Sequence, residues 1–138
     1  MSPDELTTLA HSQMPFTVLL GLEVLSGRPE EVTAGVVWKA DFCTAGGLIH
    51  GGYLMAVADS IGALCAFLNL PDGATTSTVE SKTNFFRPVT GGAIGLRATP
   101  VHTGGTIIVV QTDVSSEAGK LVSRTTQTQA VTTRGVGS

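Results

Sequence analysis

The longest apolar segment of the chain runs from Gly51 to Pro71 and contains one charged residue, Asp59. Apolar side chains would cover nearly every side of a helix formed by this segment, and the turn-forming residues from Pro71 onward would stop it. We therefore predict a helix from about His50 to Asn69 that the rest of the protein encloses. Its many glycines and alanines would let a sheet approach closely.

β-type sequences flank this helix, and each is bounded by residues that favour turns. Pro100 lies inside one of them and predicts a bulge or an edge position there. A Ser-Pro-Asp-Glu start predicts a short helix over about residues 3–13. The expected strands are Leu22–Gly27, Val32–Lys39, Thr75–Phe86, Ala93–His102, Thr106–Ser115 and Lys120–Thr133.

This order of elements predicts an α+β fold, in which an antiparallel β-sheet wraps around one long central helix. All 138 residues fit a single domain, and we expect the tail, about residues 134–138, to be disordered. Hydrophobic residues make up 42% of the chain and charged residues only 14%. So apolar a composition in a small protein predicts that part of its surface lies in subunit interfaces.

Charge and cysteine content exclude several classes of function. The net charge of -3 argues against nucleic-acid binding, which usually needs a basic surface. Cys43 and Cys65 form neither a disulfide framework nor a metal-ligand spacing, so we expect no metal. A membrane span is disfavoured because Asp59 would lie in its middle. The polar start does not resemble a signal peptide, and a cytoplasmic location is expected.

Asp59 is the first candidate for a functional residue. A carboxylate in apolar surroundings is unfavourable unless it is paired or has a task. We expect Asp59 to be buried, and burial would raise its pKa toward the range in which a carboxylate acts as a base.

Gly51 and Gly52 stand where the predicted helix begins. Their backbone N–H groups are among the donors that a helix leaves unpaired at its start, and the helix dipole adds positive potential. Such donors can stabilise an oxyanion. Gly62 and Ala63 lie one turn beyond Asp59 and would leave room for a substrate beside the carboxylate. The competing interpretation is that the glycines serve only close packing between helix and sheet.

Two motifs resemble those of a known family. The run Gly47–Gly52 (GLIHGG), followed by Ala58-Asp59, is similar to the signature of hotdog-fold acyl-CoA thioesterases. The resemblance is to the phenylacetate-pathway and 4-hydroxybenzoyl-CoA thioesterases with a carboxylate on the central helix. The run Asn84–Pro88 (NFFRP) resembles a strand end of the same group. The likeness covers roughly residues 16–131 and implies the hotdog fold.

The resemblance also implies roles for particular residues. Asp59 would be the nucleophile or the general base, and the Gly51 N–H would polarise the thioester carbonyl. Thr78, or alternatively Ser77, would supply the hydroxyl that contacts the attacking water. The family's site lies between two subunits, so the resemblance implies a homodimer, and further association to a homotetramer, with Asp59 facing the His50–Gly52 region of a partner chain.

Further residues are expected to bind the substrate. His50 would either transfer a proton or contact the leaving group, or else orient its loop through hydrogen bonds, and Gly52 lies beside it. Thr44 stands where the family commonly has Asn or Gln, so water or carbonyl positioning would be looser. Arg87 is a candidate contact for coenzyme A phosphates. Lys82, Arg97 and Arg124 could do the same or be ordinary solvated residues.

The leading hypothesis is a hydrolase that cleaves an acyl-CoA thioester into a free acid and coenzyme A. Two alternatives stay open: a non-catalytic module that binds acyl-CoA or another small ligand, and a hydratase or dehydratase acting on enoyl thioesters. We expect no cofactor apart from the coenzyme A carried by the substrate, no nucleic-acid partner and no membrane partner. An apolar pocket at a subunit interface could take aryl or medium aliphatic acyl groups.

Overall fold

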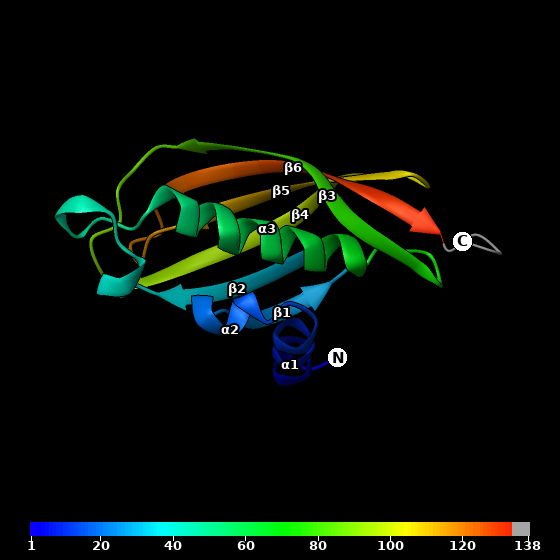
Figure 1. Cartoon of the computed structure of the whole chain (residues 1–138), viewed down its shortest axis with the longest axis horizontal. Helices are drawn as coiled ribbons and strands as arrows, with labels where there is room; N and C mark the ends of the chain where they lie inside the picture. The colour runs from blue at the N-terminus through cyan, green and yellow to red at the C-terminus, as the bar shows by residue number, and fades with distance from the viewer. Residues whose placement is uncertain (134–138) are drawn as a thin grey trace.

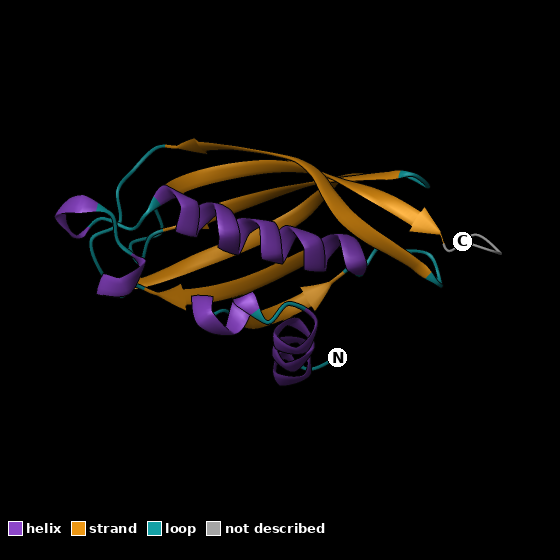
Figure 2. Cartoon of the chain, in the orientation of Figure 1, coloured by secondary structure: helices purple, strands orange, loops and turns teal. Residues whose placement is uncertain are grey.

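A computed structural model describes residues 1–133, and the expected disordered tail lies outside this range. Over these residues, strands pair into one antiparallel sheet with the order β1-β2-β4-β5-β6-β3, and helix α3 (Gly51–Phe67) lies along one of its faces (Figure 1, Figure 2). Helix α1 (Pro3–Gln13) packs against β1, and α2 (Phe16–Leu20) packs against α1 and α3. The strands are β1 (Glu23–Arg28), β2 (Glu31–Val37), β3 (Ala74–Phe85), β4 (Ala93–Thr103), β5 (Ile107–Ser115) and β6 (Leu121–Thr133).

The predicted α+β arrangement is confirmed, and it is the hotdog fold that the resemblance implied. The expected bulge is present where the register of β4 shifts between Pro100 and His102, inside the sheet rather than at its edge. The sequence reasoning missed α2, a five-residue helix that Gly21 ends in the left-handed conformation. So short a helix leaves no readable hydrophobic period.

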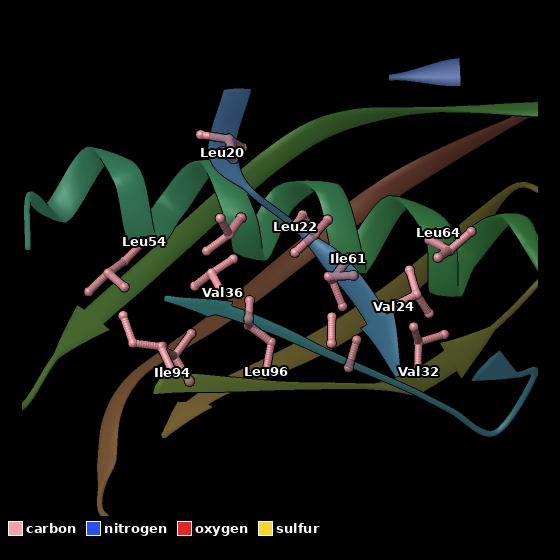
Figure 3. Close-up of a cluster of buried hydrophobic side chains, with 14 of the residues drawn as sticks. Leu20, Leu22, Val24, Val32, Val36, Leu54, Ile61, Leu64, Ile94 and Leu96 are labelled. Atoms are coloured by element: carbon pink, nitrogen blue, oxygen red, sulfur yellow. The ribbon is translucent and has the colours of Figure 1, made fainter. Parts of the chain in front are cut away.

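The core lies between α3 and the inner face of the sheet (Figure 3). Val32, Val36, Ile94 and Leu96 alternate along β2 and β4 with residues on the outer face, as a half-buried sheet requires. Ile61 on α3 is completely buried above them. Close packing of this kind fixes the position of α3 relative to the sheet.

The expectation that the rest of the chain encloses α3 is wrong for the isolated chain. Gly52, Met55, Asp59 and Phe67 are exposed, and their spacing of three, four and eight residues places them on one stripe of the helix. The sheet covers the opposite side only. An apolar helix therefore keeps one uncovered face, with Asp59 in its middle.

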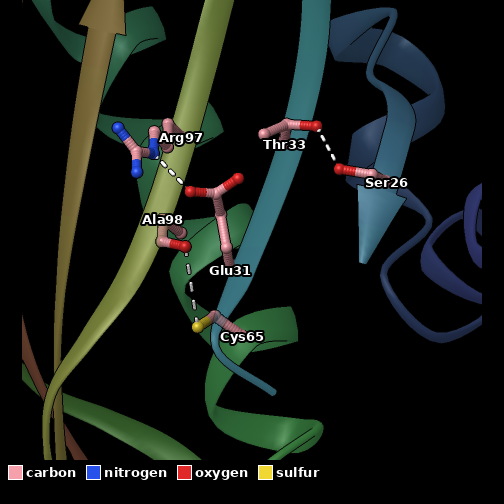
Figure 4. Close-up of polar contacts among 6 residues, drawn as sticks. All are labelled: Ser26, Glu31, Thr33, Cys65, Arg97 and Ala98. Carbon is pink, nitrogen blue, oxygen red and sulfur yellow. Dashed lines mark hydrogen bonds and ion pairs between the residues drawn. The ribbon is translucent and has the colours of Figure 1, made fainter. Parts of the chain in front are cut away.

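Polar contacts tie β1, β2 and β4 together (Figure 4). Arg97 on β4 pairs with Glu31 on β2, and the hydroxyls of Ser26 and Thr33 are 2.6 Å apart. The Cys65 thiol points from α3 toward the Ala98 carbonyl, and burial raises its pKa to about 11. Across residues 1–133, no helix is both long enough and apolar enough to span a bilayer.

Candidate active site

His50 caps the start of α3. Its backbone is extended, and its Nδ1 accepts a hydrogen bond from the Gly52 N–H at 2.8 Å. A neutral His50 ring therefore carries its proton on Nε2. This contact corrects one expectation, because the Gly52 N–H is already paired within the chain and is not a spare donor. This hydrogen bond agrees with the interpretation that His50 orients its loop at the start of the helix. Proton transfer by His50 stays a prediction.

The Gly51 N–H is the donor that remains. Among the described residues no acceptor pairs with it, and Gly51 lines a hollow of about 360 Å³ together with Thr44, Phe85, Arg87 and others. We call this space the Gly51 hollow. A Cβ added at Gly51 would lie 3.2 Å from the Phe85 ring, so glycine keeps the floor of the hollow open. A positive helix end with a free donor suits a carbonyl oxygen that gains negative charge.

Thr44 and Arg87 are brought to the same hollow, as expected for substrate contacts. The loop backbone holds Thr44, whose N–H donates to the Leu48 carbonyl at 2.7 Å. Arg87 is exposed and donates from Nη1 to the Leu121 carbonyl at 2.8 Å, which fixes its guanidinium at the rim. The contact of Arg87 with coenzyme A phosphates stays a prediction.

Two of the other basic candidates are already matched by carboxylates. Arg97 pairs with Glu31, and Arg124 donates to both oxygens of Asp113 at 2.7 and 2.9 Å. The hydrogen bonds to Asp113 raise the pKa of Arg124 further above its ordinary value. Both ion pairs are partly exposed, so each arginine could leave its carboxylate partner and bind a phosphate instead. Lys82 is exposed on β3.

Asp59 differs from its prediction in burial, and its catalytic role stays a prediction. It is exposed in the isolated chain, so the expected enclosure of the carboxylate within its own chain is wrong. Two donors nevertheless hold it: Thr78 Oγ1 at 2.7 Å and Gln127 Nε2 at 3.0 Å. Both end on Oδ1, and within residues 1–133 no donor reaches Oδ2. One carboxylate oxygen is thus anchored and the other is available.

The sequence left Thr78 and Ser77 as alternatives, and only Thr78 faces Asp59. Thr78 lies where β3 shifts register against β6, between Thr78 and Glu80. Its hydroxyl donates to Asp59. Ser77 is exposed, with no hydrogen bond to Asp59 among the described residues. Because the Thr78 proton goes to Asp59, Thr78 Oγ1 could contact a water only as an acceptor.

Gly62 and Ala63 occupy different surroundings. Gly62 is buried, and the Gln127 side chain fills the space that the sequence reasoning had left for a substrate. Ala63 is half-buried and lines an apolar hollow of about 270 Å³ with Leu9, Met14, Phe67 and others, which we call the Ala63 hollow. Open space therefore lies at Ala63, one helical turn beyond Asp59, and not at Gly62.

The sequence reasoning missed Gln127. Its side chain is fully buried under α3, on the same face of β6 as Ser123, Thr125 and Gln129. The alternation of these four polar residues was visible, but the residues between them, such as Thr126, are polar as well. No apolar face marked the inner side of the strand.

The Gly51 donor and the Asp59 carboxylate are far apart within one chain. Eight residues of α3 separate them, which corresponds to about 12 Å at 1.5 Å per residue. A single carbonyl group cannot touch both. The chain therefore presents two half-sites: Gly51 with its hollow, and Asp59 with Thr78 and Gln127.

Comparison with known proteins identifies the family. The family model described as the thioesterase superfamily matches residues 46–123, more than half of the chain. The chain belongs to the thioesterase superfamily. This matched segment contains Gly51, Asp59 and Thr78, and it stops just short of Gln127.

Individual relatives carry esterase names, which agree with a hydrolase. A relative from Haemophilus influenzae is 42% identical over 82 residues, which cover 58% of this chain and 59% of the relative. Its name describes it provisionally as an esterase. A similarly named protein of Saccharolobus solfataricus is 30% identical over 102 residues, covering 74% of this chain and 72% of the relative.

Solved structures show the same fold. A crystal structure of a thioesterase from Haemophilus influenzae superimposes with a TM-score of 0.88 at 29% identity, covering 96% of this chain and 92% of that protein. The architecture seen here is therefore that of a structurally known thioesterase over nearly its whole length, and family membership supports thioester hydrolysis in general.

Proposed function

We propose that this protein hydrolyses acyl-CoA thioesters to a free acid and coenzyme A. The observation that carries the proposal is the state of Asp59: Thr78 and Gln127 hold Oδ1, while no donor within the described residues 1–133 reaches Oδ2. A carboxylate held in this way can accept a proton from water or attack a carbonyl carbon. The family assignment supplies the reaction class, and the residues of the half-sites supply the roles.

The proposed site combines two subunits. Because Gly51 and Asp59 lie about 12 Å apart along α3, one thioester can be polarised by Gly51 and attacked through Asp59 only if they come from different chains. The uncovered stripe of α3 supports this arrangement, since it exposes Met55 and Phe67 on either side of Asp59. A second copy of the chain would cover these apolar side chains.

In the general-base route, Asp59 Oδ2 takes a proton from water while the water oxygen bonds to the thioester carbon. The Gly51 N–H of the partner subunit stabilises the negative carbonyl oxygen. The C–S bond then breaks, and the coenzyme A thiolate leaves and takes up a proton. In the nucleophilic route, Oδ2 itself bonds to the carbon, the C–S bond breaks, and water hydrolyses the resulting anhydride. Both routes use the same oxygen of Asp59.

The Ala63 hollow supports an apolar acyl group. Ala63 lies one turn beyond Asp59 on the exposed stripe, and Phe67 lies a further turn along. An acyl chain whose carbonyl lies at Asp59 could therefore extend into this space. The hollow suits aryl or medium aliphatic groups.

Thiol release from a panel of acyl-CoAs tests the proposal. We expect kcat to fall about 10²-fold or more in Asp59→Asn and Asp59→Ala, because a general base contributes about 10²–10⁴-fold. Asp113→Asn is the matched control, since Asp113 pairs with Arg124 on the outer face of the sheet. Wild-type rates in Asp59→Ala would reject the catalytic assignment.

Other outcomes would identify the alternatives. Tight binding of acyl-CoA without any thiol release would indicate a binding module, which the shorter side chain of Thr44 would suit. Formation of 3-hydroxyacyl products from enoyl-CoA would indicate a hydratase.

A further inference from the structure

Two buried glutamines lie beneath the proposed base. Gln127 and Gln129 are alternate residues of β6, and both are completely buried; Gln127 is hydrogen-bonded to α3, and Gln129 is hydrogen-bonded to β3. Burying an amide is unfavourable unless its polar atoms are hydrogen-bonded. The partners of these two side chains therefore indicate what they do.

Gln129 is the centre of a directed chain of hydrogen bonds. Thr76 Oγ1 donates to Gln129 Oε1 at 3.0 Å, and Gln129 Nε2 donates to Thr78 Oγ1 at 2.6 Å. Thr78 Oγ1 then donates to Asp59 Oδ1 at 2.7 Å. Because Gln129 occupies a lone pair of Thr78 Oγ1, the Thr78 proton is directed at Asp59. Gln129 thus controls one of the two donors to the carboxylate.

Gln127 provides the other donor directly. Its Nε2 donates to Asp59 Oδ1 at 3.0 Å and lies 3.4 Å from the Asp59 carbonyl oxygen. Among the described residues no donor reaches its Oε1, which lies against Gly62. A Cβ at position 62 would overlap this oxygen, so the absence of a side chain on Gly62 makes room for Gln127.

We propose that Gln127 and Gln129 are positioning residues for Asp59. The two paths meet at Oδ1, so they fix the carboxylate plane and leave Oδ2 as the oxygen that accepts the proton or attacks the thioester. Gly62 belongs to the same arrangement, because its lack of a side chain leaves space for the Gln127 amide. The inference rests on the proposed role of Asp59 and adds three residues that act through it.

Gln127→Met and Gln129→Met test this arrangement, since methionine approximates the length of glutamine without its hydrogen bonds. We expect kcat for phenylacetyl-CoA and octanoyl-CoA to fall about 10- to 100-fold, because small misplacements of a reacting group cost up to about 10²-fold. KM should stay within about threefold, since no substrate contact is removed. Gln111→Met on the outer face of β5 is the matched control.

The Asp59→Asn background distinguishes the positioning of Asp59 by Gln127 from a merely structural role of Gln127. There the residual rate should not change when Gln127→Met is added, because the residue through which Gln127 acts is already lost. Equal fold-losses in the two backgrounds would overturn the proposal. So would a folded Gln127→Met variant whose kcat lies within about twofold of wild type, a difference too small for lost positioning.

Gly62→Ala provides a second test that leaves both glutamines in the chain. The added methyl group should displace the Gln127 amide and lower kcat as Gln127→Met does, whereas Gly95→Ala, where a Cβ meets open space, should not. In a Gln127→Ala background, the methyl group has nothing to displace, so Gly62→Ala should cause no additional loss. Wild-type kcat in Gly62→Ala would overturn the proposal.

The failure of this inference can be told from the failure of the proposed function. Full activity in Asp59→Ala would reject the role of Asp59 and with it both proposals. An inactive Asp59→Ala beside fully active Gln127→Met and Gly62→Ala would overturn the positioning role alone.

Discussion

Replacing Gly51 by proline would remove the proposed oxyanion donor with little change elsewhere. Gly51 is the first residue of α3, the position where proline is best tolerated because its N–H has no helical partner. His50, the preceding residue, already has the extended backbone (φ -64°, ψ 133°) that a following proline requires. The substitution therefore deletes one N–H group and keeps the helix start.

Gly51→Ala is the matched control. Both substitutions add a Cβ about 3.2 Å from the Phe85 ring, which is 49% exposed and free to turn aside. Only proline removes the donor. We expect kcat to fall about 10²–10³-fold in Gly51→Pro, the cost of losing one oxyanion donor. Gly51→Ala should retain most of the activity, apart from any loss caused by moving Phe85.

The assay combines thiol release from octanoyl-CoA with thermal unfolding. A folded Gly51→Pro variant with the kcat of Gly51→Ala would refute the role of the Gly51 N–H. An equal loss in both variants would assign the effect to Phe85 and the Gly51 hollow instead of the donor.

Mixing subunits extends this test to the assignment of the half-sites. A dimer of one Gly51→Pro chain and one Asp59→Asn chain has one site with both defects and one intact site, provided that each site combines two chains. Random exchange makes half of the dimers mixed, so about a quarter of the wild-type sites should return. If both residues of a site came from the same chain, mixing two inactive variants would restore nothing.

Two further outcomes are expected. Ala63→Leu, which fills the Ala63 hollow, should raise KM for octanoyl-CoA about tenfold and leave KM for acetyl-CoA unchanged. The reason is that one misplaced methylene costs about 1–3 kcal/mol. Equal changes for both substrates would show that the acyl chain lies elsewhere. Burial raises the pKa of Cys65 from its ordinary 9.0 to about 11, so the unfolded chain loses this proton first as the pH rises. The contribution of Cys65 to the free energy of unfolding should therefore be fully present below pH 9, and the free energy should fall by about 2–3 kcal/mol toward pH 11. Denaturant titrations of Cys65→Ala should show a smaller decline over this pH range than the wild type.

The sequence predicted the elements that have a clear hydrophobic period. The long apolar run gave α3 with its ends in error by one or two residues, and the Thr- and Val-rich runs gave the strands of the sheet. Asp59 was found because it is a single charge in an apolar segment. Gly51 was found because a helix start leaves donors unpaired, a rule that depends only on local backbone geometry.

The failures concern contacts between distant segments. The His50 ring accepts a hydrogen bond from the Gly52 N–H, and this contact depends on a side-chain rotamer that sequence spacing does not determine. The apolar run indicated that α3 is enclosed, but it does not distinguish burial by the same chain from burial by a second subunit. Gln127 and Gln129 could not be found, because β6 is polar on both faces and gives no sign of which one turns inward. Their pairing with β3 places them, through a register that only the folded sheet defines.

The exposure of Asp59 then acquires a physical reason. A carboxylate enclosed by its own chain would need donors on both oxygens, and it would have no oxygen left for chemistry. Here the sheet supplies donors to Oδ1, while no donor among the described residues reaches Oδ2, and Asp59 is exposed on the same stripe of α3 as Met55. Closing that stripe with a second copy would exclude water from the carboxylate and bring a Gly51 donor to it in one step. Because an electrostatic contact is stronger in a site without bulk water, the same association that covers the apolar helix face would also strengthen the site.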